Sequence, residues 1–137
     1  MNRICLDTSA YSQFKRGHRE AVEVVTTSRL VTVPTIVLGE LRTGFRLGAR
    51  ARQNESELRE FLGRPIVRVL EVDDEAASHY ADLVADLRKA GTPVPTNDIW
   101  IAALAVREGV VVVTFDEHFS SIRRASHWIL AVSDSVE

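Results

Sequence analysis

The sequence is poor in the features that mark membrane, secreted and disulfide-stabilised proteins. It contains one cysteine, Cys5, which cannot form an internal disulfide and is predicted to be a small buried apolar residue. The longest apolar run without a charge, residues 99–106, has 8 residues, whereas a membrane-spanning helix needs about 20. An acidic residue, Asp7, follows the amino terminus too soon for a signal sequence. These absences predict a cytoplasmic protein without a membrane segment.

The sequence also lacks motifs that define several enzyme classes. Neither GxxxxGK[ST] nor GxGxxG occurs, which argues against nucleotide-dependent kinases and dehydrogenases. The 4 histidines show neither HExxH nor paired spacing, so a histidine-based zinc site is not expected. A phosphatase with Asp7 as nucleophile would usually carry a second aspartate two residues later, where this chain has Ser9.

Length and composition are those of one globular domain. The chain has 137 residues, of which 45% are apolar and 26% are charged, and both values are ordinary for soluble domains. A chain of this size buries about two thirds of the surface that its unfolded form exposes. We therefore expect a single domain over residues 1–137, with a core large enough to support a formed site.

The charges are distributed unevenly along the chain. Residues 1–70 contain 12 Lys and Arg against 7 Asp and Glu, whereas residues 71–137 contain 5 against 12. Arginine provides 15 of the 17 cations, and its planar guanidinium suits phosphate contacts, although genomic base composition can produce the same bias. Arg42, Arg46 and Arg50 recur every four residues. They would line one helix face, either as a solvated surface or as a track for RNA phosphates or an acidic partner.

Short apolar runs alternate with helical patterns along the whole chain. The first strand is predicted at residues 3–6 and the first helix at residues 10–15. Further strands are predicted at residues 30–33, 66–72, 110–114 and 128–132. Further helices are predicted from residue 36, within 49–62, from Asp73 to Gly91, and over 99–107, the last capped by residues 96–98 and closed by Gly109. This alternation predicts an α/β fold with a mostly parallel sheet covered on both faces.

Four acidic residues lie where the ligand site of such a sheet is expected. Ligands of open α/β sheets bind beyond the carboxyl ends of the strands. Residues that follow a strand or lie in an early helical turn are Asp7, Glu40, Asp98 and Asp116. Taken singly, the aspartates are also explained as turn or helix-start residues. That explanation suits Glu40 less well, because Glu40 lies in an apolar segment.

A cluster of these four acids would require a cation. Two carboxylates about 4 Å apart repel by roughly 4 kcal/mol at an effective dielectric constant of 20, and burial adds a further penalty. Oxygen ligands without accompanying histidine or cysteine favour Mg²⁺ or Mn²⁺, which also bind substrate phosphates. Such ions activate water for attack on a phosphodiester, so no nucleophilic side chain is needed.

The same acids lie in segments that resemble a known family, the PIN-domain ribonucleases and, within it, the VapC-type toxins of bacterial toxin–antitoxin pairs. The similar segments are Leu6-Asp7-Thr8-Ser9, Glu40-Leu41-Arg42-Thr43-Gly44, Asn97-Asp98-Ile99-Trp100-Ile101-Ala102-Ala103 and Thr114-Phe115-Asp116-Glu117-His118-Phe119. They occur in the order and at the spacing typical of the family. Residues 49–96 are similar to it only in general character.

The resemblance implies a three-layer α/β/α sandwich, endonucleolytic cleavage of RNA, a homodimer, and a separate antitoxin protein that blocks the site. The Mg²⁺ or Mn²⁺ ligands that it implies are Asp7, Glu40, Asp98 and Asp116. The hydroxyl groups that it implies as orienting partners of these carboxylates or of water are those of Thr8 or Ser9 and of Thr114. Asp116 is preferred over its neighbour Glu117 as the fourth ligand, and His118 is a candidate RNA contact.

Two other interpretations remain open from the residues alone. In a non-catalytic module, the basic helix would bind a protein or a nucleic acid, the acids would only cap helices, and binding would need no metal. A phosphoacceptor receiver domain would use Asp7 or Asp116 in its acidic pocket, but it requires a lysine near the last strands. The only lysines are Lys15 and Lys89. The acidic run at residues 71–75 is assigned to a helix start rather than to a metal site.

Overall fold

The centre of the molecule is a five-stranded parallel sheet. The structure, a computed structural model, describes residues 2–132. The strands are β1 (Arg3–Leu6), β2 (Leu30–Pro34), β3 (Val67–Leu70), β4 (Val111–Thr114) and β5 (His127–Ile129). Their order across the sheet is β3-β2-β1-β4-β5, and every neighbouring pair is parallel. The predicted parallel sheet is therefore confirmed.

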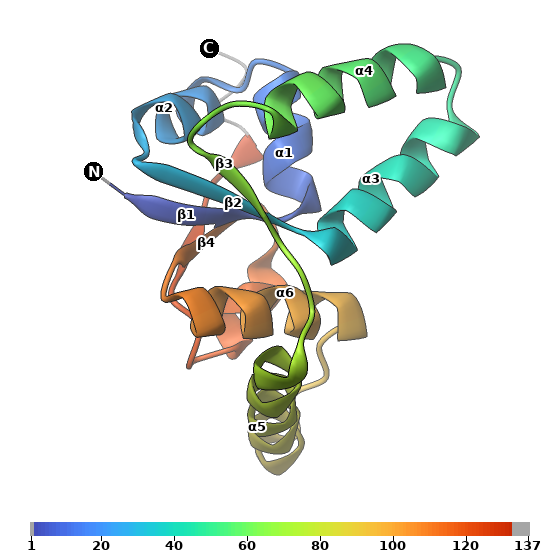
Figure 1. Cartoon of the computed structure of the whole chain (residues 1–137). Coiled ribbons are helices and arrows are strands. Elements are labelled where there is room, and N and C mark those ends of the chain that lie inside the picture. The colour runs from blue at the N-terminus through green and yellow to red at the C-terminus, as the bar shows by residue number, and fades with distance from the viewer. Residues whose placement is uncertain (1, 133–137) are drawn as a thin grey trace.

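Helices cover both faces of this sheet. The connections from β1 to β3 contain α1 (Thr8–Lys15), α2 (Arg19–Thr27), α3 (Thr35–Leu47) and α4 (Ala51–Leu62). The return from β3 to β4 contains α5 (Asp74–Ala90) and α6 (Thr96–Glu108), and a short 3₁₀ helix, η1 (Glu117–Ser121), leads to β5. Figure 1 shows α1–α4 on one side of the strands and α5 and α6 on the other, as right-handed crossovers require. The predicted three-layer α/β/α sandwich is confirmed.

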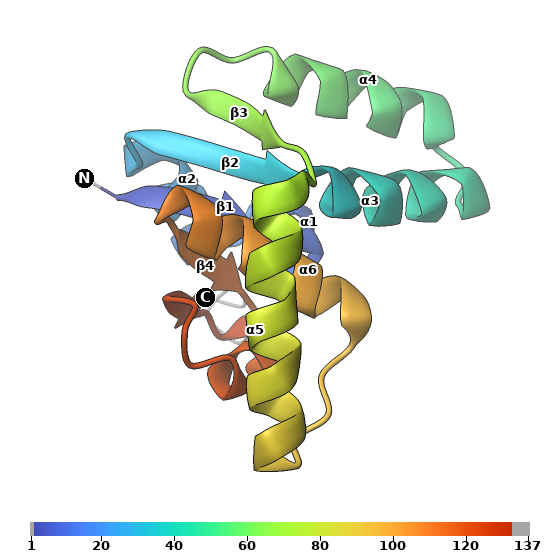
Figure 2. The ribbon, with the colours of Figure 1, turned by 60° about the horizontal axis from the view of Figure 1, so that its bottom comes forward.

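Helices α3 and α4 form a hairpin that projects beyond the sheet. They pack side by side, and Figure 2 shows both extending away from the strands. Leu47, the last residue of α3, is 85% exposed. The hairpin is therefore attached to the sheet at one end, where α3 leaves β2, and presents its other end to solvent.

The core extends over both faces of the sheet, and on one face it includes the small apolar side chains of α6. Every side chain of residues 101–105 in α6 is buried, as are residues 4–6 of β1. Cys5 is fully buried and free, as predicted, and burial raises the pKa of its thiol to about 12, which makes it unreactive. None of the helices within residues 2–132 combines the length and the apolar character that a bilayer-spanning segment requires.

Several predicted element boundaries are confirmed by their caps. The carboxylate of Asp73 accepts a hydrogen bond from Ala76 N at 2.9 Å and caps α5. Helices α5 and α6 end at Gly91 and Gly109, which have φ of +67° and +68°. Left-handed backbone of this kind favours glycine, so these two residues end the helices for a simple steric reason.

Other boundaries were predicted wrongly. Residues 96–98 do not cap α6 but form its first turn, after Pro95 and without a side-chain cap. The side chains of Asn97 and Asp98 face other carboxylates instead of the helix backbone. The last strand covers His127–Ile129 rather than residues 128–132. Helix α2 was not predicted, because it begins at a histidine instead of a usual capping residue.

The cap of α2 is the buried side chain of His18. Its Nδ1 accepts a hydrogen bond from Ala21 N at 3.2 Å, and its Nε2 lies 2.9 Å from the carbonyl oxygen of Ala131. The ring packs edge-on against Phe115 with 4.9 Å between ring centroids. Since one nitrogen accepts and the other donates, these contacts define a neutral imidazole with its proton on Nε2. His18 thus joins α2, the site-side loop after β4, and the segment after β5.

We expect the substitution His18→Ala to lower the free energy of unfolding by about 2–4 kcal/mol, because it removes a helix cap, a buried hydrogen bond and aromatic packing together. Urea denaturation followed by circular dichroism measures this loss. The control His79→Ala removes a partly exposed imidazole on α5 and should cost less than about 0.5 kcal/mol. Equal losses for the two variants would contradict the assigned role of His18.

Candidate active site

The end of β1 places Asp7 in the interior of the protein. Asp7 follows Leu6, the last residue of β1, and caps the amino terminus of α1. Only 4% of its surface is exposed. Its Oδ1 accepts hydrogen bonds from Ala10 N and Ser9 Oγ, each 2.8 Å long, and its Oδ2 accepts one from Thr114 Oγ1. Three donors therefore fix the orientation of this buried carboxylate.

The hydroxyl groups around Asp7 also bind the loop that follows β4. Strands β1 and β4 are parallel neighbours, so their carboxyl ends lie together. The hydroxyl of Thr114 accepts a hydrogen bond from Asp116 N at 2.9 Å, and that of Ser9 accepts one from Phe115 N at 3.0 Å. The two hydroxyls thus link Asp7 to the backbone that carries Asp116.

A second carboxylate, that of Glu40, is held by a separate pair of donors. Glu40 lies on α3 and accepts a hydrogen bond from Thr8 Oγ1. It also accepts one from Asn97 Nδ2, on α6, at 3.0 Å. Thr8 therefore contacts Glu40 rather than Asp7, which distinguishes the two hydroxyls that the sequence left as alternatives. The partnership of Asn97 was not predicted, although this residue directly precedes Asp98.

The remaining acids meet around a histidine. Asp98 lies in the first turn of α6 and Asp116 directly precedes η1. His118 Nδ1 is 3.0 Å from Asp116 Oδ1 and 3.5 Å from Asp98 Oδ2. One candidate ligand atom from each of the three residues lies within 4.8 Å of the others. Glu117 is exposed and belongs to no such group among residues 2–132, so the geometry favours Asp116 over its neighbour.

Burial and neighbouring charges shift the ionisation of two of these carboxylates, Asp98 and Asp7. Burial, together with the charges of Asp116, Asp7 and Glu40, raises the pKa of Asp98 to about 6, while His118 acts in the opposite direction. Burial also raises the pKa of Asp7, although its three hydrogen bonds act in the opposite direction and the charge of Asp116 adds to the increase. The structure therefore brings together the four acids that the sequence selected.

The donor set fits a hard divalent cation. The carboxylate oxygens of Asp98 and Asp116 lie together, and the imidazole of His118 adds one nitrogen. Asp7 Oδ2 accepts one hydrogen bond and retains a second lone pair. Carboxylates with at most one imidazole suit Mg²⁺ or Mn²⁺ better than zinc. The mutual repulsion that raises the pKa of Asp98 is what such a cation would relieve.

The three predicted basic residues do not form one helix face. Arg42 makes a bidentate contact with Glu55 of α4, with N–O distances of 3.0 to 3.2 Å. Arg46 lies one turn further along α3 and is exposed. Arg50 lies beyond the end of α3, directly before α4, and donates to Gln53 Oε1 at 3.2 Å. The prediction was wrong for Arg50, because the turn at residues 48–50 ends the helical repeat.

Comparisons with known proteins identify the family of the chain. Residues 4–125 match the model of the PIN domain family. The chain is 32% identical to ribonuclease VapC5 of Mycobacterium tuberculosis over 121 residues, which are 88% of each protein.

Two solved structures have the same fold along nearly their whole length. DNA-bound VapBC from Salmonella typhimurium superimposes with a TM-score of 0.81 at 27% identity, over 94% of this chain and 98% of that one. A second structure, VapBC-5 from Mycobacterium tuberculosis, is described as a member of the VapBC family of toxin-antitoxin systems. It superimposes with a TM-score of 0.73 at 30% identity, over 96% of this chain and 99% of that one.

The family model covers most of the chain, and so does the alignment with VapC5. The chain therefore belongs to the PIN domain family and, within that family, to the VapC-type toxins.

Proposed function

We propose that this protein is an endoribonuclease that depends on Mg²⁺, with Mn²⁺ as a substitute, and that it is the toxin of a type II toxin–antitoxin pair. The observation that carries this proposal is the convergence of four carboxylates at the carboxyl ends of β1 and β4 in a chain of the PIN family. The relative from Mycobacterium tuberculosis is named a ribonuclease, which supports RNA as the substrate.

The proposed ligands of the metal are Asp7, Glu40, Asp98 and Asp116, of which Asp98 and Asp116 lie in one group with His118. When bound, a divalent cation would lower the pKa of water and offset the negative charge of the phosphodiester. The chain's own contribution is orientation. Asp7 is held by its three donors, and Glu40 is held between Thr8 and Asn97, so these oxygens need little rearrangement when substrate arrives.

The proposed partners are an antitoxin protein and a second copy of the chain. The similarity to VapBC-5, described as part of a toxin-antitoxin system, supports an inhibitory partner that covers the acidic site. We further propose a single domain, a homodimer and a cytoplasmic location, as the resemblance to VapC-type toxins implies. Membership of the PIN family disfavours the receiver-domain alternative. RNA cleavage that requires a divalent metal would distinguish the enzyme from a binding module, whose binding needs no metal.

The substitutions Asp98→Asn and Asp116→Asn should each lower RNA cleavage by at least about 100-fold, because each removes a proposed metal ligand. The assay incubates purified protein, freed from any antitoxin, with total cellular RNA in Mg²⁺, in Mn²⁺ and in EDTA, and maps new RNA ends. Asp7→Asn is tested in parallel and should be equally inactive.

The matched control is Glu117→Gln, which neutralises the acid next to Asp116 but outside the carboxylate group. It should retain cleavage within about threefold of wild type. If wild type makes no metal-dependent cuts while it still binds RNA in EDTA, the enzyme proposal fails and the binding-module interpretation replaces it. If Glu117→Gln is inactive and Asp116→Asn is active, the fourth ligand has been assigned to the wrong residue.

Asp98 should make the metal-free protein less stable as pH rises. At low pH the carboxyl group of Asp98 is protonated in both the folded and the unfolded chain. Between its ordinary pKa of 3.8 and its folded value of about 6, the unfolded chain releases the proton first, so stability falls across this range and remains lower above it. Melting curves in EDTA from pH 4 to pH 8 measure the trend.

The substitution Asp98→Asn removes this dependence and should raise the melting temperature of the metal-free protein by a few degrees at pH 7.5. The control Glu117→Gln should leave it unchanged within about one degree. A decrease of several degrees for Asp98→Asn would contradict a repulsive carboxylate cluster.

A further inference from the structure

Helix α6 begins without a side-chain cap, although capping residue types stand at its start. Asparagine and aspartate are preferred one position before a helix, where their side chains accept hydrogen bonds from free backbone amides. In α6 that position is held by Pro95, and Asn97 and Asp98 follow inside the first turn. Their side chains face carboxylates instead. A helix start that gives up its cap in this way is expected where function rather than stability selects the residues.

Asn97 completes the hydrogen bonding of Glu40. The Nδ2 of Asn97 donates to Glu40 Oε2 at 3.0 Å, and the hydroxyl of Thr8 donates to Oε1. The two donors come from different helices, α6 and α1, while Glu40 lies on α3. Each carboxylate oxygen therefore has one protein donor and keeps a lone pair for a cation or a water molecule.

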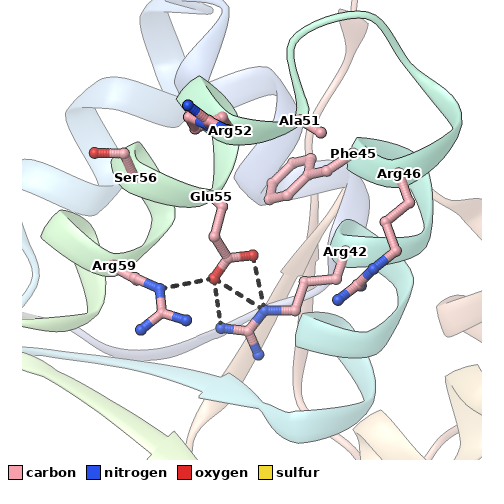
Figure 3. A pocket seen from close by; sticks show the side chains of 8 residues that line it. All are labelled: Arg42, Phe45, Arg46, Ala51, Arg52, Glu55, Ser56 and Arg59. Carbon is pink, nitrogen blue, oxygen red and sulfur yellow. Dashed lines mark hydrogen bonds and ion pairs between the residues drawn. The ribbon is translucent and has the colours of Figure 1, made fainter.

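Neither partner of Glu40 neutralises its charge. The nearest following cation on α3, Arg42, is engaged by Glu55 of α4 through a bidentate contact (Figure 3). Among residues 2–132, Glu40 makes no ion pair, and both of its hydrogen-bond donors are neutral. An arginine in the place of Asn97 would orient the carboxylate equally well but would cancel its charge. The amide fixes the orientation and leaves the full negative charge available to a divalent cation.

The first turn of α6 thus serves two parts of the carboxylate group. Consecutive helical residues point about 100° apart around the axis. Asn97 reaches Glu40 on α3, whereas Asp98 lies with Asp116 and His118. The position of this one turn therefore determines how Glu40 is held relative to the acids that follow β4.

From these contacts we infer that Asn97 is a positioning residue of the proposed metal site, where its amide fixes the orientation of Glu40 without neutralising it. The inference rests on the proposed ribonuclease function and extends it to a residue beyond the four acids and their hydroxyl partners. Removal of a group that orients a metal-binding carboxylate typically lowers metal affinity or activity 10- to 100-fold. An amide that only tied α3 to α6 would change stability and leave metal affinity intact.

The first test measures Mn²⁺ binding in the absence of RNA, from the electron paramagnetic resonance signal of free Mn²⁺. Asn97→Ala removes the donor and should weaken binding about tenfold. Asn97→Gln retains an amide donor at this exposed position and should bind within about threefold of wild type. The matched control is Thr96→Ala, which changes the exposed preceding residue of the same turn and should alter affinity less than twofold.

The second test measures thermal melting of the same variants in EDTA. Asn97→Ala should shift the melting temperature by no more than about two degrees, because the lost hydrogen bond is at the surface and alanine has the higher helix propensity. A lower melting temperature together with unchanged Mn²⁺ affinity would identify a purely structural role and overturn the inference.

The third test follows single-turnover cleavage of total RNA as Mn²⁺ is varied. At a Mn²⁺ concentration well below saturation of wild type, Asn97→Ala should cleave about tenfold more slowly. At saturating Mn²⁺ its rate should return to within about threefold of wild type, because the variant has lost metal affinity rather than a reacting group. A loss that added Mn²⁺ does not restore would contradict a role exerted through the metal.

The outcomes separate Asn97 from the enzyme proposal. If wild type cleaves RNA while Asn97→Ala binds Mn²⁺ within twofold of wild type, the inference is overturned and the proposed function stands. The inference also fails if Asn97→Gln or the Thr96→Ala control loses as much affinity as Asn97→Ala. If wild type binds Mn²⁺ but makes no cuts, the proposed function fails and the Mn²⁺ affinities alone decide the role of Asn97. Absence of Mn²⁺ binding by wild type overturns both.

Discussion

The repulsion among four carboxylates is the constraint on which the rest of the site depends. Isolated acids at the surface would turn away from one another into water, and the fold prevents this for Asp7 and Glu40 by giving each carboxylate its own donors. The cost appears in the raised pKa of Asp98, where burial and three like charges act together. A bound cation would relieve this repulsion, which is why the proposed function includes one.

The sheet order explains how residues far apart in the chain meet. Strands β1 and β4 are adjacent and parallel, so Asp7 and the loop after β4 emerge at one edge of the sheet. Helix α6 returns to this edge with its small apolar side chains against the strands, which brings Asp98 to the first turn facing the site. Hydroxyl groups complete the assembly, since those of Ser9 and Thr114 bind a carboxylate and a backbone amide at once.

The uneven distribution of charge along the sequence corresponds to two separate regions of the fold, the arginine-rich α3/α4 hairpin and the acidic site. The excess of arginine in residues 1–70 is concentrated partly on the α3/α4 hairpin, which projects from the sheet (Figure 2). The acids lie at the base of the same hairpin.

Local sequence patterns determined the strands, most helices and the identity of the four acids. Apolar runs such as residues 110–114 and caps such as Asp73 depend on interactions within a few residues, so they can be read without the fold. Only the tertiary structure decided which donors hold each acid. It paired Thr8 with Glu40 instead of Asp7, added Asn97, and placed His118 between two carboxylates.

The same limit explains what the sequence patterns predicted wrongly or left out. Arg50 does not lie on one helix face with Arg42 and Arg46, because a turn interrupts the helical repeat. Helix α2 begins after His18, whose buried imidazole contacts the carbonyl of Ala131. Such contacts join residues that are distant in sequence, and their geometry exists only once the sheet has set the relative positions of the elements. The sequence by itself thus determined the chemistry available at the site, and the packing of the elements decided its arrangement.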